Sequence, residues 1–342
     1  MEEVDCIVLI SDKLKNGDDL EMKIEAAREI RSMIRNRNNS GEKIRSKFGG
    51  AGVIKPLVGM LCLENDDAVQ VSLLALLNLA SKNKRNKEEI VTCGAIPPLV
   101  NLLKLQNTSN LGELAIAAIL TLSASSNNKA AIVNSEAIPF LIQIISSGTI
   151  QGRADAVNAL HNLATSKQEP TIILDTTATS PLINLLKESK KYSKFAERAT
   201  ALIEIISKSQ EGINAITNAE DGILTLVETV EGGSLVSKEH ALSVLLTLCI
   251  SSRSKYRELI LNEGAIPGLL RLTIDGTHQG QSKAKMLLGL LRDSPSEKKL
   301  SQSVLEKMVQ EIAARVNKSE RRRAETAKKL MQDLVQRRMA RV

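Results

Sequence analysis

The segment Gly94-Ala-Ile-Pro-Pro-Leu99 decides the fold, because copies of it return along the chain at a nearly constant interval. The clear copies are Gly52-Val-Ile-Lys-Pro-Leu57, Glu136-Ala-Ile-Pro-Phe-Leu141 and Gly264-Ala-Ile-Pro-Gly-Leu269, and weaker ones are Thr177-Ala-Thr-Ser-Pro-Leu182 and Asp221-Gly-Ile-Leu-Thr-Leu226. The six segments start 42, 42, 41, 44 and 43 residues apart. This interval is typical of helical repeats and exceeds that of the tetratricopeptide, ankyrin and leucine-rich classes.

A second segment keeps the same interval further along each unit. It reads Ala75-Leu-Leu-Asn-Leu-Ala80, Ala118-Ile-Leu-Thr-Leu-Ser123 and Ala159-Leu-His-Asn-Leu-Ala164, and its later copies start at Ala201, Val244 and Met286. Two independent segments in register across six units indicate a true internal repeat.

The residues of one unit predict three helices. A short helix over Asn86 to Thr92 ends at Gly94, since glycine readily adopts the positive φ common at helix ends. Pro97 falls in the first turn of a second helix, where its missing N–H costs nothing. A third helix over 112–123 is apolar on most faces, so neighbouring units must cover it. The repeats are therefore predicted to stack on one another.

These residues resemble the armadillo repeat family, and within it the armadillo region of plant U-box proteins. The similarity is carried by Ala26-Ala-Arg-Glu-Ile-Arg31, by Gly94-Ala-Ile-Pro-Pro-Leu-Val-Asn-Leu-Leu103 and by Ala159-Leu-His-Asn-Leu163. It implies an all-α fold, a right-handed superhelical armadillo-repeat solenoid of three-helix units. The predicted organisation is an N-terminal cap over 1–50, about six repeats over 51–294 and a C-terminal capping repeat over 295–342. Because Met1 already lies in helical cap sequence, we expect no U-box in this chain.

One seam and the C-terminal segment depart from the regular pattern. Residues 168–179 are rich in β-branched side chains and are interpreted as a degenerate first helix. The net charge is +7, and +6 of it comes from 318–342, whose last helix is in phase with the repeats. This basic patch comprises Arg321, Arg322, Arg323, Lys328, Lys329, Arg337 and Arg338. It is interpreted as a solvated face of the cap, with nucleic acid or anionic lipid as alternative partners.

Composition limits the class of protein. Aromatic residues make up only 1% of the chain while 43% is hydrophobic, which favours close helix packing over a sandwich or barrel. The four cysteines have no metal-site spacing, and we expect them to be buried in a reducing compartment. Since neither a leader nor a membrane-spanning run is apparent, the protein is expected in the cytoplasm, the nucleus or both.

No set of residues predicts catalysis. His161, His240 and His278 lie in different repeats, and no phosphate loop, nucleophile elbow or Cys–His pair occurs. We therefore expect no enzyme activity, no cofactor, no metal and no small-molecule substrate.

The resemblance instead points to a groove that binds a protein or an extended peptide. In armadillo proteins the third helices line the concave face, where an asparagine typically holds the peptide backbone. The positions singled out here are Asn78, Thr121, Asn158, Asn162, Thr200, Glu204, Ser243 and Thr247. Nuclear-import adaptors also carry tryptophan four residues before the asparagine, and this chain has none, which argues against nuclear-localisation peptides. Asn78 and Asn162 are alternatively interpreted as residues that brace neighbouring helices.

Three functions follow as hypotheses. The first is a non-enzymatic scaffold that binds a partner along the groove. The second, suggested by the U-box relatives, is a substrate-binding component of a ubiquitin-ligase pathway. The third is an adaptor that associates with membranes or nucleic acid through its basic C-terminal helix.

Overall fold

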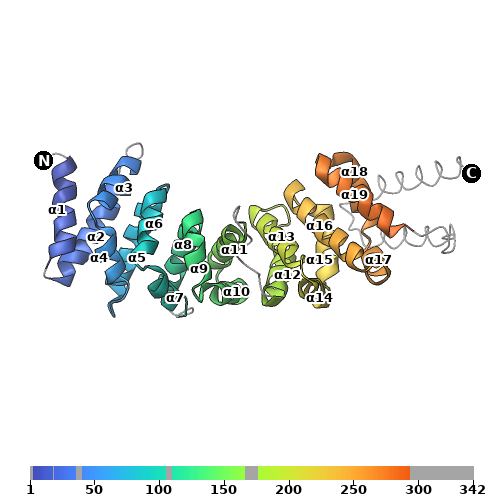
Figure 1. The fold of residues 1–342 in the computed structure, drawn as a ribbon, viewed down its shortest axis with the longest axis horizontal. Helices are drawn as coiled ribbons and strands as arrows, with labels where there is room; N and C mark the ends of the chain where they lie inside the picture. Colours follow the sequence, from blue (N-terminus) through green and yellow to red (C-terminus); the bar gives the residue numbers. More distant parts are fainter. Residues whose placement is uncertain (1–2, 18, 36–40, 105–109, 166–175, 293–342) are drawn as a thin grey trace, which may run out of the picture. The chain divides into compact units, whose positions relative to one another are not determined.

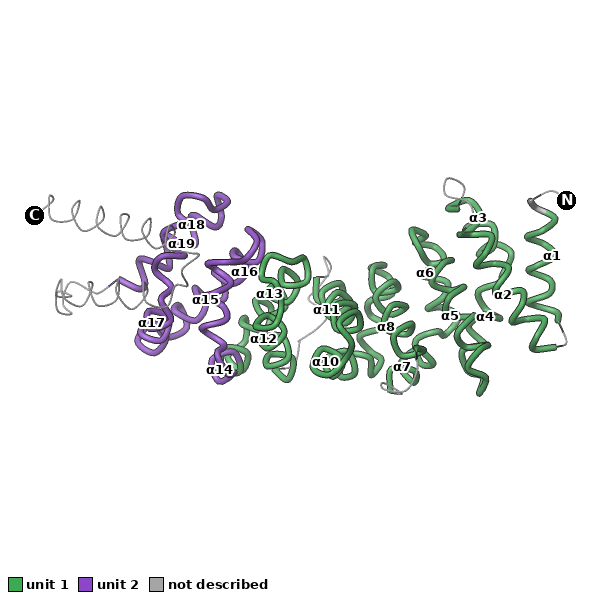
Figure 2. Tube along the Cα trace, turned by 180° about the vertical axis from the view of Figure 1, so that it is seen from behind, with its two compact units in different colours: residues 1–215 green, residues 216–342 purple. Residues whose placement is uncertain are grey.

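The computed structural model describes residues 3–17, 19–35, 41–104, 110–165 and 176–292, and over these residues the chain is built from helices without strands. Helices that follow one another in the sequence lie next to each other within each unit (Figure 1). The chain divides into two compact units, residues 1–215 and 216–342 (Figure 2). The all-α repeat architecture predicted from the sequence is confirmed. The right-handed superhelical course concerns both units together and stays a prediction.

Unit 1 begins with a helix pair, α1 (Glu3–Asn16) and α2 (Leu20–Arg35). Four three-part repeats follow: α3 (Gly41–Gly50), α4 (Ile54–Met60) and α5 (Asp66–Ala80); α6 (Lys84–Thr92), α7 (Ile96–Lys104) and α8 (Asn110–Ser123); η1 (Ser126–Asn128) with α9 (Lys129–Val133), α10 (Ala137–Ser147) and α11 (Ile150–Ala164); η2 (Thr176–Ala178), α12 (Thr179–Glu188) and α13 (Lys194–Ile206). Although α3 lies within the predicted cap, it packs on α5 and α6 as the first helix of a complete repeat.

Two further repeats occupy the described residues 210–292. Their helices are α14 (Gln210–Asn218), which contains the division between the units, α15 (Gly222–Gly232), α16 (Leu235–Ser251), α17 (Arg253–Asn262), α18 (Ile266–Asp275) and α19 (His278–Leu291). Arg253 and Arg257 of α17 donate to backbone carbonyls at the end of α19, Arg253 Nε to Leu290 O at 2.7 Å. These guanidinium groups satisfy carbonyls that a helix end otherwise leaves without partners.

The local chemistry of the repeat is as predicted. α6 begins after Asn83, whose side chain accepts a hydrogen bond from Asn86 N, and it ends at Cys93 before Gly94 at φ 89°. α7 then carries Pro97 in its first turn. The same left-handed conformation recurs at the first residue of three other copies of the motif: Gly52, Asp221 and Gly264. The recurrence of glycine in the motif therefore follows from the backbone, because side chains with a Cβ rarely adopt this conformation.

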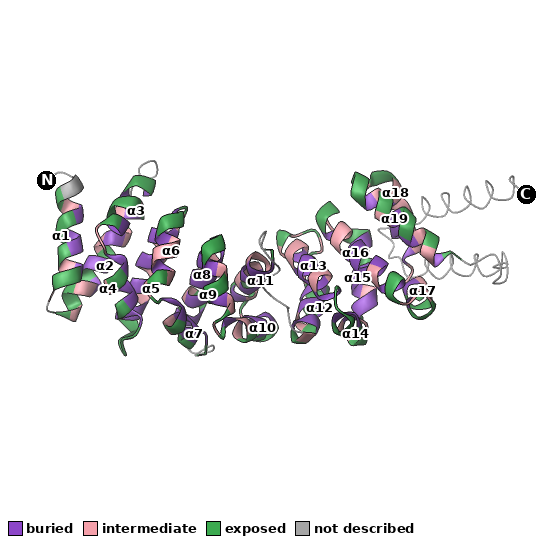
Figure 3. Ribbon diagram, viewed as in Figure 1, coloured by how far each residue is buried: buried purple, intermediate pink, exposed green. Residues whose placement is uncertain are grey.

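The core of unit 1 lies where the third helices stack. α2, α5, α8, α11 and α13 pack on one another in that order, and α5, α8, α11 and α13 each pack also on the second helix of the same repeat. Fully buried alanines such as Ala75, Ala115 and Ala159 allow close approach, and buried leucines and isoleucines fill the space between. Figure 3 marks the buried parts of these helices in purple. Phe48 of α3 is a fully buried aromatic side chain of this unit, and the rest of the core consists mainly of Leu, Ile, Val and Ala.

Buried asparagines join successive repeats. Asn86, 1% exposed, donates from Nδ2 to Leu79 O at 3.0 Å and to Arg45 O at 2.9 Å, which connects α6 to the end of α5 and to the middle of α3. Asn128 repeats this arrangement one repeat later, with Leu122 O and Lys87 O as acceptors. Each asparagine thus joins the end of one third helix to a first helix of the preceding repeat, and its buried amide group is hydrogen-bonded.

Three expectations need correction or lie outside the described residues. Cys249 is buried, but Cys62 is exposed, and Cys6 and Cys93 are only half-buried, so the four cysteines do not all act as core residues. Cys62 follows the short helix α4 in a surface turn. Most of the seam at 168–179 and all of the C-terminal cap from 295 fall outside the described residues. Among the described residues, no single helix is long and apolar enough to cross a membrane, although the pair 126–133 and 137–147, bent by 88°, reaches that length and composition together.

Candidate partner-binding surface

The predicted groove positions all lie on third helices. Unit 1 contains Asn78 on α5, Thr121 on α8, Asn158 and Asn162 on α11, and Thr200 and Glu204 on α13; unit 2 contains Ser243 and Thr247 on α16. Since α5, α8, α11 and α13 pack side by side, the structure places the unit 1 positions on four neighbouring helices. We call the solvent-accessible sides of these four helices, which carry the half-buried residues Asn78, Thr121, Asn162 and Glu204, the third-helix surface.

The two asparagines on this surface differ in what their side chains bind. Asn78 Nδ2 donates to Leu74 O of its own helix at 2.6 Å, and Arg45 Nε of α3 donates to the backbone carbonyl of Asn78 at 3.0 Å. Asn162 Nδ2 donates to Ser123 Oγ of α8 at 3.1 Å. The contact of Asn162 supports its interpretation as a brace of a neighbouring helix, whereas the hydrogen bond of the Asn78 side chain stays within α5; both side chains are half-buried.

The other polar positions differ in their access to solvent. Thr121 and Thr247 are half-buried, and each hydroxyl donates to a carbonyl four residues earlier at 2.8 Å. Asn158 Oδ1 accepts a hydrogen bond from Arg198 at 2.7 Å. Glu204 is half-buried on α13.

Thr200 and Ser243 are corrected as contact residues. Thr200 is completely buried and its hydroxyl donates to Ala196 O. Ser243 is 7% exposed, donates to Glu239 O at 2.8 Å and accepts from Lys283 Nζ at 2.6 Å. Neither side chain offers a partner enough surface.

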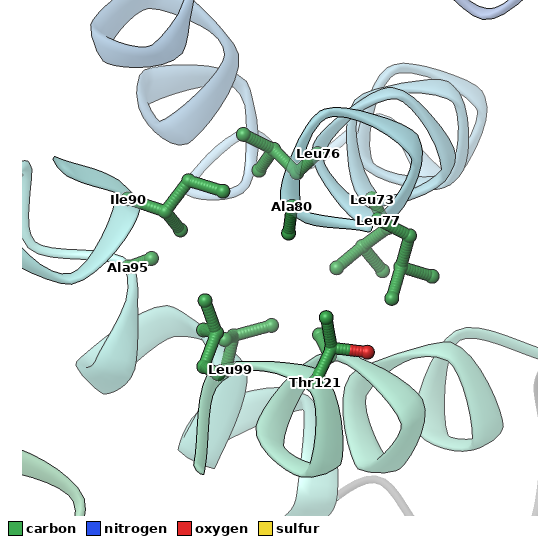
Figure 4. Close-up of a pocket in the computed structure, with 10 residues that line it drawn as sticks. Leu73, Leu76, Leu77, Ala80, Ile90, Ala95, Leu99 and Thr121 are labelled. Carbon is green, nitrogen blue, oxygen red and sulfur yellow. The ribbon is translucent and has the colours of Figure 1, made fainter. Parts of the chain in front are cut away.

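Apolar side chains are the part of the third-helix surface that the sequence interpretation missed. Half-buried on α5 and α8 are Leu74, Leu77, Leu114, Ala117 and Leu120, which we call the apolar strip. The sequence did indicate these apolar residues, because Leu74 and Ala117 occupy the positions, four residues before Asn78 and Thr121, that hold tryptophan in nuclear-import adaptors. Leu77 and Thr121 approach each other from α5 and α8 (Figure 4).

The space beneath this junction is nearly filled. Leu73 and Leu76 of α5, Leu99 of α7 and Leu122 of α8 are among the side chains that surround it, and it has room for about one water molecule (Figure 4). A pocket of this size and apolar lining does not accommodate an organic ligand. Recognition at this place therefore depends on the surface above.

Carboxylates lie toward the N-terminal ends of three third helices. These are Asp66 and Asp67 on α5, Glu113 on α8 and Asp155 on α11, and we call this row the acidic edge. Asp67 pairs with Arg28 at 2.8 Å, and Glu113 accepts from Thr149 Oγ1 at 2.8 Å. Burial raises the pKa of the Asp155 carboxyl, a hydrogen bond from Gln151 lowers it, and the charge of Glu113 raises it further. Glu113 and Asp155 therefore repel each other across α8 and α11.

The described residues contain no cluster of three or more His, Cys, Asp or Glu side chains that could hold a metal ion. His161 lies on α11 and His240 on α16, within helices as predicted. The predicted basic patch from Arg321 to Arg338 lies outside the residues described, so its role stays a prediction.

Comparisons with known proteins agree with this architecture. The family model "Plant U-box protein ARM repeat region" matches residues 141–312, and the model "Armadillo/beta-catenin-like repeat" matches 83–112. U-box domain-containing protein 17 of Arabidopsis thaliana is 39% identical over 265 residues, 77% of this chain and 35% of that protein. U-box domain-containing protein 45 of the same plant is 29% identical over 284 residues, 82% of this chain and 36% of its own length. The chain thus spans about a third of the length of these relatives.

Among solved structures, the crystal structure of an engineered protein shares the fold with a TM-score of 0.67 at 21% identity. The similarity covers 96% of this chain and 77% of that one.

Proposed function

Because the chain belongs to the family of plant U-box protein ARM repeat regions, we propose that it is a non-enzymatic scaffold that binds a protein partner on the third-helix surface. Helical-repeat proteins commonly present such extended surfaces to partners. The observation that carries the proposal is the side-by-side packing of α5, α8, α11 and α13, which places half-exposed apolar and amide side chains on one surface.

The test compares proteins that co-purify with the intact chain and with the variant Asn78→Ala/Asn162→Ala, quantified by mass spectrometry. Asn127→Ala is the matched control, because Asn127 is exposed on η1 and donates to Glu88 Oε1 away from this surface. The proposal expects partners that the double variant loses and the control retains, with thermal unfolding confirming that both variants are folded. Identical partners for all three proteins would refute the assignment of the surface.

A second candidate function is substrate binding in a ubiquitin-ligase pathway. It is favoured by the relatives, whose names identify them as U-box domain-containing proteins. The test is ubiquitin transfer to a captured partner in the presence of a conjugating enzyme, with the 342-residue chain alone or fused to a U-box. We expect transfer only with the fusion, and only when the third-helix surface is intact. Transfer by the chain alone would contradict the non-enzymatic assignment.

A further inference from the structure

We infer that the occupant of the third-helix surface is an amphipathic helix, whose apolar face packs on the apolar strip and whose basic flank faces the acidic edge. This inference rests on the proposed function and specifies the chemistry of the partner. It depends on what α5, α8 and α11 offer to a partner's backbone, to its apolar side chains and to its charges.

The third helices of unit 1 offer few hydrogen-bonding side chains to the backbone of an extended peptide. An extended peptide brings N–H and C=O groups that need partners at each repeat, whereas a helix satisfies its own. The four corresponding positions of unit 1 are Asn78, Thr121, Asn162 and Glu204, so an amide is present only at alternate repeats. The Thr121 hydroxyl already donates to Ala117 O, and both asparagine amides donate within the repeats. A regular ladder for an extended backbone is therefore missing.

The apolar strip on α5 and α8 has the spacing of helix positions one turn apart. Leu74 and Leu77 lie one helical turn apart on α5, and Leu114, Ala117 and Leu120 follow the same spacing on α8. All five are half-buried, so each still presents apolar area that a partner would remove from water. Ala117, the smallest of the five side chains, lies between Leu114 and Leu120 along α8. A partner helix packs apolar anchors at helical spacing on a surface of this kind.

The helices that carry the acidic edge have more acidic than basic side chains. The helices α5, α8 and α11 together carry Asp66, Asp67, Glu113 and Asp155, while Arg153 is their single Lys or Arg and lies 2.8 Å from Glu188. The charge of Glu113 raises the pKa of the Asp155 carboxyl, and neither carboxylate is a partner in the described ion pairs. Lysine or arginine on the facing flank of a bound helix relieves this repulsion and fixes the direction in which the helix lies.

The experiment selects a phage-displayed library of linear peptides on the intact chain and counter-selects on the variant Ala117→Glu. Glutamate at 117 keeps a good helix former but places a carboxylate under the partner's apolar face. Ala130→Glu is the matched control, since Ala130 is exposed on α9, a first helix. Synthetic copies of the enriched peptides are then titrated by fluorescence anisotropy against the folded proteins.

The inference expects enriched peptides with apolar residues at i, i+3, i+4 and i+7 and with Lys or Arg on one flank. Ala117→Glu should weaken their binding by about 100-fold, Ala130→Glu should leave it within about twofold, and Glu113→Gln/Asp155→Asn should weaken it by about tenfold with less salt dependence. Peptides without this spacing, peptides that bind Ala117→Glu equally, or no peptide dependent on Ala117 would overturn the inference. If a co-purifying partner then needs Asn78 and Asn162 but tolerates Ala117→Glu, the helix inference falls while the proposed function stands.

Discussion

A double-mutant cycle between Gly49 and Asn86 tests how successive repeats are joined. Asn86 is 1% exposed and donates from Nδ2 to two carbonyls, one in α3 and one in α5. Asn86→Ala removes both hydrogen bonds and leaves Leu79 O, near the end of α5, without this partner in the interior. At about 1 kcal/mol for each bond and about 1 kcal/mol for the unsatisfied carbonyl, the free energy of unfolding should fall by about 3 kcal/mol.

Gly49 occupies the space next to this amide. A Cβ at position 49 would lie 2.1 Å from Asn86 Oδ1 and 3.0 Å from Cγ, so Gly49→Ala cannot be accommodated while the amide keeps both acceptors. We expect Gly49→Ala alone to cost about 2–3 kcal/mol. In the Asn86→Ala background the clash is gone, and alanine should instead stabilise α3 by about 0.5–1 kcal/mol relative to glycine. The double variant should therefore be slightly more stable than Asn86→Ala.

The measurement is urea unfolding of the four proteins, with hydrogen exchange of α3 and α6 to locate the change, because repeat proteins need not unfold in one step. Asn128→Ala is the control, because Asn128 makes the same kind of contact but does not lie next to Gly49. Asn128 makes the equivalent bonds one repeat later, to Lys87 O and Leu122 O, so its cost should simply add to that of Gly49→Ala. If Gly49→Ala adds to Asn86→Ala in the same way, the proposed conflict between Gly49 and the amide is refuted.

Three further predictions concern single residues. Asp155→Asn should raise the temperature midpoint of unfolding at pH 7. Because folding raises the pKa of the Asp155 carboxyl, the folded state binds more protons than the unfolded state. The contribution of this carboxyl to stability therefore falls as pH rises above its ordinary pKa of 3.8. Thermal unfolding at several pH values checks this, and a gain that persists unchanged below that value would contradict it. Asp221→Gly should stabilise the protein by about 0.5–1 kcal/mol because Asp221 has φ 55°; an unchanged or lower urea midpoint would argue against strain there. In a pulse of iodoacetamide at neutral pH, exposed Cys62 should be alkylated in the folded protein and Cys249 only after unfolding, since burial raises the pKa of the Cys249 thiol to about 11; equal labelling by peptide mass spectrometry would show that the Cys249 site opens readily.

The fold was largely predictable because its determinants are local and repeat. Gly94 at a left-handed position and Pro97 in the first turn of α7 mark a helix junction within a few residues, and the interval of about 42 residues shows that each junction belongs to a stack. The hydrogen bonds that join the stack were not predictable in the same way. Asn86 and its acceptor in α3 are 41 residues apart, and the sequence pattern does not distinguish a buried bridging amide from an exposed one.

The surface positions were less predictable than the helices. Asn158 and Thr200 occupy the same place in successive repeats, yet the first is half-exposed and the second completely buried. The difference depends on how neighbouring elements pack, which repeat register alone does not specify. Register did locate the third-helix surface, but burial decides which of its side chains a partner can reach.

Bracing of the helices and recognition of a partner draw on the same polar groups. Asn162 donates to Ser123 of the preceding third helix, and Asn158 accepts from Arg198 of the following one. A polar group held in such a bond contacts a partner only if the partner replaces the bond or uses its remaining hydrogen-bonding capacity, and an unpaired buried group is costly. Apolar side chains have no such conflict, since Leu74 or Leu120 packs on its neighbours through one side and on a partner through the other. In a stack whose third helices are tied together by polar bonds one repeat apart, the apolar strip should therefore supply most of the binding free energy, and the loss of Asn78 and Asn162 should reduce capture because the partner is no longer correctly oriented.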